Sequence, residues 1–238
     1  MRLDQLLVER GLVSSREKAR ALILAGQVRV DGQKIDKAGQ AVPSEARLEL
    51  IETPRYVGRG GLKLEAALQH FHISPTAKIC LDVGSSTGGF TDCLLQHGAA
   101  RVYAIDVGTA QLDWKLRNDP RVVLHEQVNA RYLSRREVPE TIDLAVADVS
   151  FISITMILPA MATLLAQDAE MVILVKPQFE LERKQVEKGG IIRDPALHAR
   201  ACQRVEDAVR QLGFQTGIVA SPVLGAEGNQ EFLLYARH

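Results

Sequence analysis

The segment ICLDVGSSTGGFTDCLLQHG, residues 79–98, decides the class of fold. It begins as an apolar run, turns at Gly84, Gly88 and Gly89, and continues with an amphipathic helical pattern. Glycine lets the backbone bend sharply at such a turn and approach a ligand at the start of the following helix. A strand, a glycine-rich turn and a helix in this order predict the first unit of a nucleotide-type parallel sheet.

Apolar strands and amphipathic helices alternate along the rest of the chain, which predicts a sheet covered on both faces. We expect strands at 79–83, 101–106, 121–125, 142–147, 170–176, 214–221 and 230–236. We expect helices near 62–71, 89–97, 110–116, 153–166 and 196–212. The turn VLGAEGN, residues 223–229, is too short for a crossover helix, so the last strand should run antiparallel. The expected fold is α/β: a Rossmann-like, seven-stranded sheet with an antiparallel last strand.

A small α+β module is expected before the sheet. The segment LDQLLVERG, residues 3–11, predicts a short helix, and Ser14 with Glu17 forms a capping-box pattern for a second helix that Gly26 ends. Asp31-Gly32, between alternating apolar and polar residues, predicts a two-residue hairpin.

The boundary of this module is marked by residues that continue neither a helix nor a central strand. Pro54 is followed by closely spaced glycines as far as Gly61. We therefore expect the module at 1–53, a linker at 54–61 and a second domain at 62–238.

Charge is distributed unevenly along the 238 residues. The chain holds 29 Lys and Arg and 29 Asp and Glu, yet residues 1–60 carry a net charge of +3. Cationic residues of the first module could face phosphates: Arg16, Lys18, Arg20, Arg29 and Lys34. An ordinary solvated helix face has the same pattern, so the charges alone leave both readings open.

Composition excludes several classes of function. No run of 18 or more apolar residues could span a bilayer, and Asp4 and Glu9 interrupt any N-terminal signal peptide. Three scattered cysteines with no CxxC spacing indicate reduced thiols in a cytoplasmic protein. No cluster of His, Cys and Asp has metal-ligand spacing, so we expect no metal site.

The N-terminal module resembles the RNA-binding fold first described in ribosomal protein S-four. The residues that match in register are Arg2-Leu3-Asp4, Ser15-Arg16, Ala19, Gly26, Val28, Val30 and Gly32. The resemblance implies binding to structured RNA. The residues expected to contact RNA are Arg2, Arg16, Lys18, Arg20, Arg29, Lys34 and Arg59.

The glycine turn has the pattern D-x-G-x-x-x-G-G, which is neither the G-x-G-x-x-G of dinucleotide enzymes nor a P-loop. Asp82 stands where a carboxylate could meet a cation. Asp106, 24 positions later, could accept hydrogen bonds from both hydroxyls of a ribose. S-adenosylmethionine fits this pattern, because it carries a sulfonium and an adenosine but no phosphate. A sheet of this kind without a cofactor is the alternative.

Charged residues stand at or just past the ends of expected strands, where open parallel sheets place their active sites. These are Asp148, Lys176 and Glu231, and Lys63 at the start of a helix could complete two lysine–carboxylate contacts. Methyl transfer to a ribose hydroxyl is helped by a base, and a lysine serves as one only where its surroundings favour the neutral amine. Which lysine is the base, if either, stays open.

Each of these residues also has an ordinary reading. Lys63 could be a surface lysine, Asp148 a helix N-cap and Glu231 a charge on an edge strand. Lys176 could pair with Glu180 in the loop that follows it. Their joint placement at strand ends favours one shared site.

The four residues on this sheet resemble the Lys-Asp-Lys-Glu tetrad of FtsJ-type ribose 2′-O-methyltransferases. With the RNA-binding module in front, the whole chain resembles the TlyA (haemolysin A) family of ribosomal-RNA methyltransferases. The motifs that carry this resemblance are GRGGLKL, LDVGSSTGGFTD, ADVSFIS, VKPQFE, KGGIIRDP and GNQEFL. It implies methylation of a ribose 2′-hydroxyl, that of a cytidine, in 16S or 23S RNA, with S-adenosylmethionine as the donor.

Carried over by residue, the resemblance implies a catalytic set and a cofactor set. The catalytic set is Lys63, Asp148, Lys176 and Glu231. The cofactor set is Asp82, Gly84, Ser86, Thr87, Gly88, Gly89, Phe90, Asp106, Asn129 and Asp148. Residues 86–90, Ser-Thr-Gly-Gly-Phe, replace the Ala-Pro-Gly-Gly-Trp of FtsJ proteins. Asn129 stands where they carry an acidic residue for the adenine amino group, a hydrogen bond that an amide oxygen could also accept.

Rival functions find less support. A base-amino methyltransferase would show Asp/Asn-Pro-Pro-Tyr/Phe where this chain has Asp148-Val149-Ser150-Phe151, and an NAD oxidoreductase lacks its glycine pattern. A membrane-active role, suggested by the haemolysin name, has no spanning segment. A non-catalytic RNA-binding protein remains the alternative from another class.

The expected partner is ribosomal RNA or a ribosomal subunit, with no membrane and no obligate protein partner. The loop 179–194 could be a mobile lid hinged at Gly189-Gly190.

Overall fold

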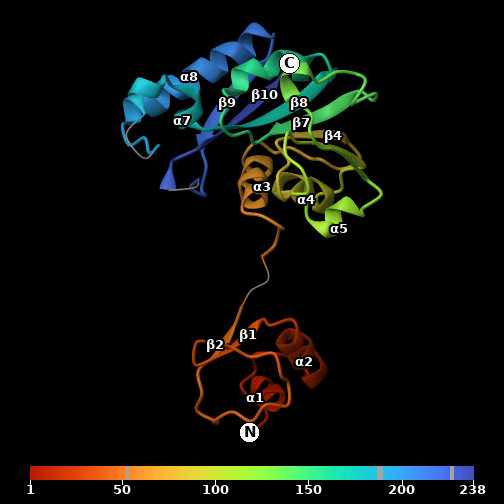
Figure 1. Cartoon of the computed structure of the whole chain (residues 1–238), viewed down its shortest axis with the longest axis vertical. Coiled ribbons are helices and arrows are strands. Elements are labelled where there is room, and N and C mark those ends of the chain that lie inside the picture. The colour runs from red at the N-terminus through yellow and green to blue at the C-terminus, as the bar shows by residue number, and fades with distance from the viewer. Residues whose placement is uncertain (52–53, 187–189, 226–227) are drawn as a thin grey trace. The chain divides into compact units, whose positions relative to one another are not determined.

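The chain forms two compact units, Met1–Pro54 and Arg55–His238, in a computed structural model (Figure 1). The structure describes residues 1–51, 54–186, 190–225 and 228–238. Gly189 of the expected lid hinge lies outside these residues. Each unit has its own hydrophobic core.

The N-terminal unit packs two helices on a small antiparallel sheet. Its helices are α1 (Leu3–Glu9) and α2 (Arg16–Leu24), and its strands are β1 (Val28–Val30), β2 (Gln33–Lys34) and β3 (Leu48–Leu50), in the order β2-β1-β3. Asp31 and Gly32 join β1 to β2 with φ angles of 50° and 81°. Two left-handed residues make the turn that twists with its strands, which is why Asp-Gly predicted the hairpin.

The cap of α2 lies one residue later than the sequence pattern indicated. The side chain of Ser15, not Ser14, accepts a hydrogen bond from the backbone N–H of Lys18 at 3.2 Å. Ser15 is in the extended conformation that an N-cap requires. Lys18 therefore occupies the third helical position, and Glu17 does not complete a capping box.

A buried carboxylate anchors α1 to α2. The side chain of Asp4 is fully buried and lies 3.0 Å from both Arg2 Nε and Arg16 Nη2. Hydrogen bonds from Arg2, and then from Arg16, lower the pKa of Asp4 to about 2 although burial opposes the shift. Asp4 thus fixes two arginines that are expected to contact RNA.

The second unit is a seven-stranded sheet in the order β6-β5-β4-β7-β8-β10-β9. Its strands are β4 (Ile79–Val83), β5 (Arg101–Ile105), β6 (Val122–His125), β7 (Ile142–Ala147), β8 (Leu165–Val175), β9 (Gln215–Ala220) and β10 (Phe232–Arg237). Strand β10 pairs antiparallel with both β8 and β9. The predicted seven-stranded sheet with an antiparallel last strand is confirmed.

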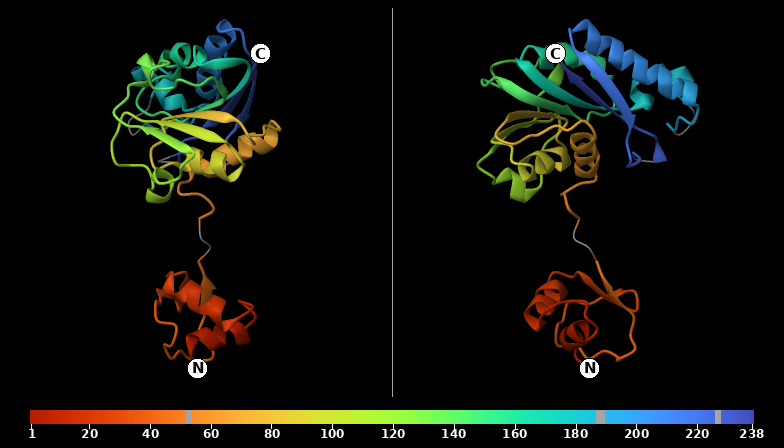
Figure 2. Two further views of the ribbon diagram at one scale, coloured as in Figure 1. Left: turned by 90° about the vertical axis from the view of Figure 1, so that its right-hand side faces the viewer. Right: turned by 180° about the vertical axis from the view of Figure 1, so that it is seen from behind.

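Helices cover both faces of this sheet, as Figures 1 and 2 show for α8 on one face and α3 and α4 on the other. The α-helices are α3 (Gly60–His70), α4 (Gly89–Gln96), α5 (Trp114–Arg117), α6 (Leu158–Ala162), α7 (Pro177–Glu180) and α8 (Pro195–Gln211). Short 3₁₀ helices are η1 (Ala130–Tyr132), η2 (Ile154–Met156) and η3 (Arg183–Gln185). Alternate strand residues enter opposite cores, Cys80 with the helix residues Leu64 and Leu94, and Leu81 with Met161 and Val205.

Two predicted helices are shorter than expected. The helix expected at 153–166 is divided into η2 and α6, and β8 begins at Leu165, which pairs with Ile142. Pro159 stands in the first turn of α6, where proline is tolerated, but a helix cannot continue through it. The helix expected at 110–116 starts only at Trp114, because the Asp113 side chain caps it by accepting from Lys115 N at 2.9 Å.

Replacing Asp4 with Asn should destabilise the N-terminal unit. The loss should be about 1–2 kcal/mol at pH 7, because two charge-assisted hydrogen bonds are weakened but both arginines are half exposed. The pKa of Asp4 is 3.8 ordinarily and about 2 in the fold, so its contribution is present above about pH 4 and is lost as the pH falls towards 2.

Denaturation followed by circular dichroism measures this effect on the full chain. The first 54 residues contain no Trp, Tyr or Phe, so fluorescence reports only on the second unit and serves as the control. A variant as stable as the parent at pH 7, or a difference that does not shrink below pH 4, would contradict the assignment.

Candidate active site

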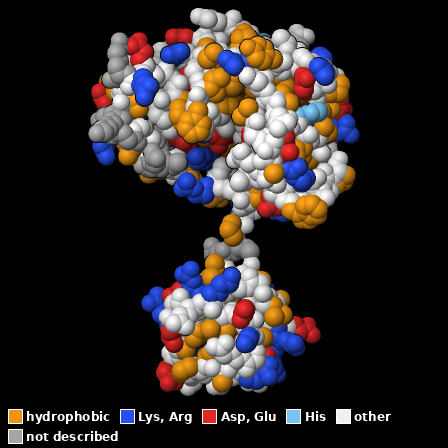
Figure 3. All heavy atoms as spheres, in the orientation of Figure 1, with side chains coloured by type: hydrophobic (Ala, Val, Ile, Leu, Met, Phe, Trp, Pro, Cys, Tyr) orange, Lys and Arg blue, Asp and Glu red, His pale blue; other side chains and the backbone are white. Residues whose placement is uncertain are grey.

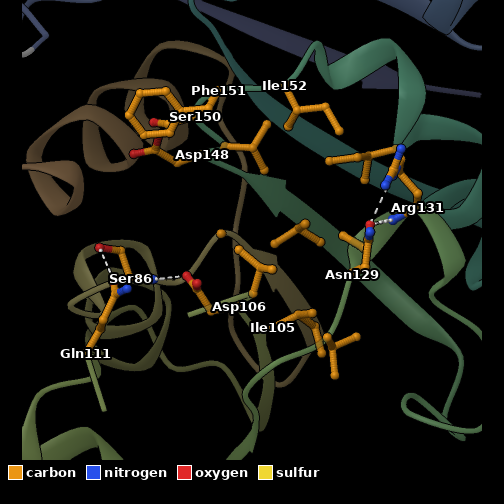
Figure 4. A pocket seen from close by; sticks show the side chains of 17 residues that line it. Ser86, Ile105, Asp106, Gln111, Asn129, Arg131, Asp148, Ser150, Phe151 and Ile152 are labelled. Carbon is orange, nitrogen blue, oxygen red and sulfur yellow. Dashed lines mark hydrogen bonds between the residues drawn. The ribbon is translucent and has the colours of Figure 1, made fainter. Parts of the chain in front are cut away.

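A cavity of about 460 Å³ opens at the carboxyl ends of β4, β5 and β7 (Figure 4). Residues from five segments line it: Val83, Gly84, Ser86, Ile105, Asp106, Val107, Gln111, Val128, Asn129, Ala130, Arg131, Asp148, Val149, Ser150, Phe151, Ile152 and Ile157. Open parallel sheets bind their ligands at this edge. The apolar side chains of the walls surround a few polar groups, as in sites for small cofactors.

The glycine turn is shaped by packing within the protein. Gly84 has a φ of 83°, and a Cβ there would overlap the backbone oxygen of Asp148. Gly88 has a φ of 98°, and a Cβ there would overlap Leu116. Only glycine fits both positions, for conformational and steric reasons.

Part of the predicted cofactor set does not line the cavity. Gly84, Ser86, Asp106, Asn129 and Asp148 do, whereas the remaining members of the set are absent from its walls: Asp82, Thr87, Gly88, Gly89 and Phe90. Phe90 packs instead beneath the start of α3, where a Cβ on Gly60 would lie 3.3 Å from its ring.

Asp106 is fixed on the wall of the cavity by the turn itself. Its Oδ2 accepts from the backbone N–H of Ser86 and its Oδ1 from that of Gly108, both at 2.7 Å. The Ser86 hydroxyl donates to Gln111 Oε1 at 3.2 Å (Figure 4). A carboxylate held in this way keeps free lone pairs for the hydroxyls of a ligand.

Asn129 is oriented by its neighbour Arg131. The Asn129 Oδ1 accepts from both the backbone N–H and the Nε of Arg131, each at 3.2 Å. Because both partners are N–H donors, the oxygen must face them, and the amide nitrogen is the group free to meet a ligand.

Asp82 lies behind the cavity and is fully buried. Its Oδ2 accepts from the Thr91 hydroxyl at 2.6 Å, while its Oδ1, like the hydroxyl of Ser85, has no hydrogen-bond partner among the described residues. Burial raises the pKa of Asp82 to about 7, and the charges of Asp148 and Asp106 act in the same direction. Three carboxylates therefore lie close enough to interact, an arrangement that suits a cationic ligand.

The four residues of the predicted catalytic set form two ion pairs. Lys63 Nζ lies 2.5 Å from Glu231 Oε2, and Lys176 Nζ lies 2.6 Å from Asp148 Oδ1. Phe232 pairs with Val175 in antiparallel register, so the residues next to that pair, Glu231 and Lys176, lie at the same edge of the sheet. The start of α3 approaches Asp148, because a Cβ on Gly60 would lie 3.7 Å from Asp148 Oδ2.

The ordinary readings of these residues do not describe the structure. The side chain of Lys63 is 9% exposed and that of Glu231 is 3% exposed, so neither is a surface charge. Lys176 pairs with Asp148 and not with Glu180, and its Nζ also donates to Ser150 Oγ at 2.9 Å. Charges buried to this extent are tolerated only in pairs.

The residues expected to contact RNA are all exposed. Arg2, Arg16, Lys18, Arg20, Arg29 and Lys34 belong to the N-terminal unit, and Arg59 caps α3 in the second. Figure 3 shows cationic side chains at several places on the visible face of the N-terminal unit.

Several residues of the site were not identified from the sequence. Ser150 and Phe151 lie two and three residues after Asp148 in the motif ADVSFIS, which was a usable signal. Phe151 is 92% exposed, has a φ of 66°, and lies beside Asp148 in Figure 4. Gln111 and Arg131 had no distinguishing pattern.

No helix in the described ranges is long and apolar enough to cross a membrane. Within the same ranges, no group of three or more His, Cys, Asp and Glu side chains could hold a metal ion.

Comparison with known proteins identifies relatives along the whole chain. A model of FtsJ-like methyltransferases matches residues 56–238, and a model of the S4 domain matches residues 1–48. A Mycobacterium tuberculosis protein named 16S/23S rRNA (cytidine-2′-O)-methyltransferase TlyA is 46% identical over 239 residues, which cover 99% of this chain and 89% of the relative. A Brachyspira hyodysenteriae protein named Hemolysin A is 46% identical over 240 residues, 99% of each chain.

A solved structure with a similar fold matches the whole chain. The structure titled "Putative hemolysin from Streptococcus thermophilus" superposes with a TM-score of 0.76 at 44% identity, covering 100% of this chain and 88% of that one. The predicted family resemblance is thereby confirmed.

Replacing Asp82 with Asn should stabilise the second unit above neutral pH. A buried carboxylate whose pKa is raised from 3.8 to about 7 costs the folded state most when it is ionised, by up to about 4 kcal/mol. The gain should therefore be full above about pH 7 and shrink as the pH falls towards 4. Urea denaturation followed by Trp114 fluorescence at pH 5 and pH 8 tests this. An equal gain at both values would show that ionisation is not the cause.

Replacing Lys63 with Met should destabilise the second unit by about 3–5 kcal/mol, because Glu231 is left buried without a counter-ion. The double variant Lys63→Met/Glu231→Leu should recover most of the loss. Lys115→Met is the control, since Lys115 is 58% exposed and its partner Asp92 keeps other donors. If the double variant were no more stable than Lys63→Met, the unpaired Glu231 would not explain the loss of stability.

Proposed function

Because the chain belongs to the FtsJ-like methyltransferase family, it is an S-adenosylmethionine-dependent methyltransferase, and we propose that its acceptor is the ribose 2′-hydroxyl of a cytidine in 16S or 23S ribosomal RNA. The observation that carries the proposal is the joint presence of two lysine–carboxylate pairs, one of them buried, and a cofactor-sized cavity that Asp148 lines. The named substrate of the Mycobacterium tuberculosis relative supports the choice of acceptor.

The residues of the cavity fit S-adenosylmethionine. Asp106 is placed to accept from the ribose hydroxyls, and the amide nitrogen of Asn129 is free to donate to a ring nitrogen of the adenine. The carboxylates of Asp82, Asp106 and Asp148 favour the cationic end of the ligand. Gly88, Gly89 and Phe90 contribute from behind the wall, because they form the turn that carries Gly84 and Ser86 into α4.

The bound cofactor supplies a methyl group on a sulfonium, which a nucleophilic oxygen can accept. The protein has to orient that oxygen and remove its proton. Of the four residues only Asp148 lines the cavity; Lys176 contacts two lining residues, Asp148 and Ser150, whereas Lys63 and Glu231 pair with each other. We therefore assign proton removal to Lys176, orientation of the hydroxyl to Asp148, and support of the pair to Lys63 and Glu231.

RNA binding is assigned to the N-terminal module, predicted at residues 1–53, and methyl transfer to the second unit, which begins at Arg55 and takes up most of the predicted linker 54–61. Arg2 and Arg16, held by Asp4, would meet phosphates with little loss of side-chain freedom. Lys18, Arg20, Arg29 and Lys34 extend the cationic surface of this module, and Arg59 adds an exposed cationic side chain to the second unit. The exposed ring of Phe151 at the cavity is placed to stack on the base of the entering nucleotide.

Ribosomal RNA, free or in a subunit, is then the macromolecular partner, and its location makes the cytoplasm the site of action. The proposal requires neither a membrane nor another protein. A non-catalytic RNA-binding protein would have no use for the paired buried charges beside the cavity, because such charges cost stability. Catalysis is therefore the better account of the site.

Replacing Lys176 with Ala should lower the rate of methyl transfer by about 10²–10⁴-fold and leave cofactor affinity within a few-fold, because proton removal is lost while the cavity stays intact. Labelled cofactor, ribosomal RNA and mass-spectrometric mapping of methylated riboses give the rate and the position. Calorimetry gives the affinity.

Lys115→Ala, at an exposed lysine of the same unit, is the matched control and should retain the full rate. Normal activity of the Lys176 variant would refute the assigned role. Methylation mapped to a base and not to a ribose would refute the reaction itself.

A further inference from the structure

Glu180 is a buried carboxylate that belongs neither to the cavity wall nor to the two ion pairs. It ends α7 and is 3% exposed. Its Oε1 accepts from the backbone N–H of Ile154 at 2.8 Å, and its Oε2 accepts from the Ser153 hydroxyl at 2.5 Å. Burial raises the pKa of Glu180, while these two bonds oppose the shift. A carboxylate is retained in such a place only when both oxygens are satisfied.

The two donors stand at the far end of the loop that begins at Asp148. This loop, residues 148–153, carries Asp148, Ser150 and Phe151. Its near end contacts Lys176, which pairs with Asp148 and donates to Ser150 Oγ. Lys176 directly precedes α7, and Glu180 ends α7. Side-chain contacts therefore connect the loop and α7 at both ends and close a ring.

The loop includes a residue in an unfavourable conformation. Phe151 has a φ of 66°, a left-handed value that a bulky side chain adopts only when its surroundings enforce it. Phe151 is 92% exposed, and its ring centroid lies 5.3 Å from that of Phe179, the residue before Glu180. One aromatic contact on an exposed ring is a weak restraint. The hydrogen bonds at Ser153 and Ile154 are the restraint at the other end.

We propose that Glu180 is a positioning residue: its carboxylate anchors the loop 148–153 so that Ser150 stays bonded to Lys176 and Phe151 stays at the cavity. The role depends on reach and hydrogen bonding and not on the charge of Glu180. The effect on catalysis rests on the proposed function, whereas the anchoring itself does not.

Two conservative substitutions separate reach from charge. In Glu180→Gln the amide oxygen can accept from Ile154 N, and the amide nitrogen can donate to Ser153 Oγ, whose own proton turns to Thr155 Oγ1, 2.7 Å away. In Glu180→Asp the charge remains, but the carboxylate is withdrawn by about 1.5 Å, one carbon–carbon bond. If the length of the side chain matters, Glu180→Gln should keep the loop anchored and Glu180→Asp should not. If the charge matters, the two variants should behave the other way round.

The test measures kcat, the KM for S-adenosylmethionine and hydrogen exchange at the Ile154 amide in the full-length variants. Glu180→Asp should lower kcat by about 10²-fold, as a shift of 1 Å in a positioned group can, with KM within a few-fold. Glu180→Gln should keep kcat within a few-fold of the parent. The Ile154 amide should lose protection in the Asp variant only.

Glu137→Asp is the matched control, because Glu137 also accepts from a serine hydroxyl, at 2.8 Å from Ser134 Oγ, but away from the loop. Full activity of Glu180→Asp, or equal losses in both Glu180 variants, would overturn the proposal. If the parent protein methylated no RNA, the proposed function would be refuted. Hydrogen exchange at the Ile154 amide would still decide whether Glu180 anchors the loop.

Discussion

Two lysines at the carboxyl edge of the sheet are tolerated because each is paired with a carboxylate. Lys63 and Glu231 are almost completely buried, and Lys176 and Asp148 are only slightly more exposed. Removing Lys63 or Glu231 would leave a buried charge without its counter-ion. Four segments that are remote along the chain must therefore meet at one place, and the glycine turn after β4 and the start of α3 are packed together to allow it.

Much of this could be read from the sequence because strand period and strand ends are strong signals. The apolar runs gave all seven strands of the sheet, the charged residues at their ends gave Asp148, Lys176 and Glu231, and the glycines before α3 drew attention to Lys63. The first part of β8 was not predicted as a strand, because residues 165–169 include polar positions that interrupt the apolar pattern. The sequence also predicted too many residues for the cavity wall. Thr87 to Phe90 belong to the turn, but they support α3 and α4 and do not form the wall.

Other features had no local signal. Nothing near Asp4 indicated a buried carboxylate between two arginines, since the contact to Arg16 joins two helices. The left-handed conformation of Phe151 occurs in a loop, residues 148–153, whose sequence contains no glycine that would have marked it. Glu180 looked like a partner for Lys176 because the two are close in sequence, yet the fold gives each of them a different partner. Such pairings follow from tertiary structure, which periodicity does not encode.

The place of β10 in the sheet has a consequence for biosynthesis. This strand is the last of the seven along the chain, yet it lies between β8 and β9, and Glu231 immediately precedes it. While the polypeptide is still emerging from the ribosome, β8 and β9 have no strand to join them, and Lys63 has no counter-ion. The enzyme is therefore assembled only when synthesis has passed residue 237. A nascent chain that already displays a folded N-terminal unit can touch RNA but has no completed centre with which to modify it.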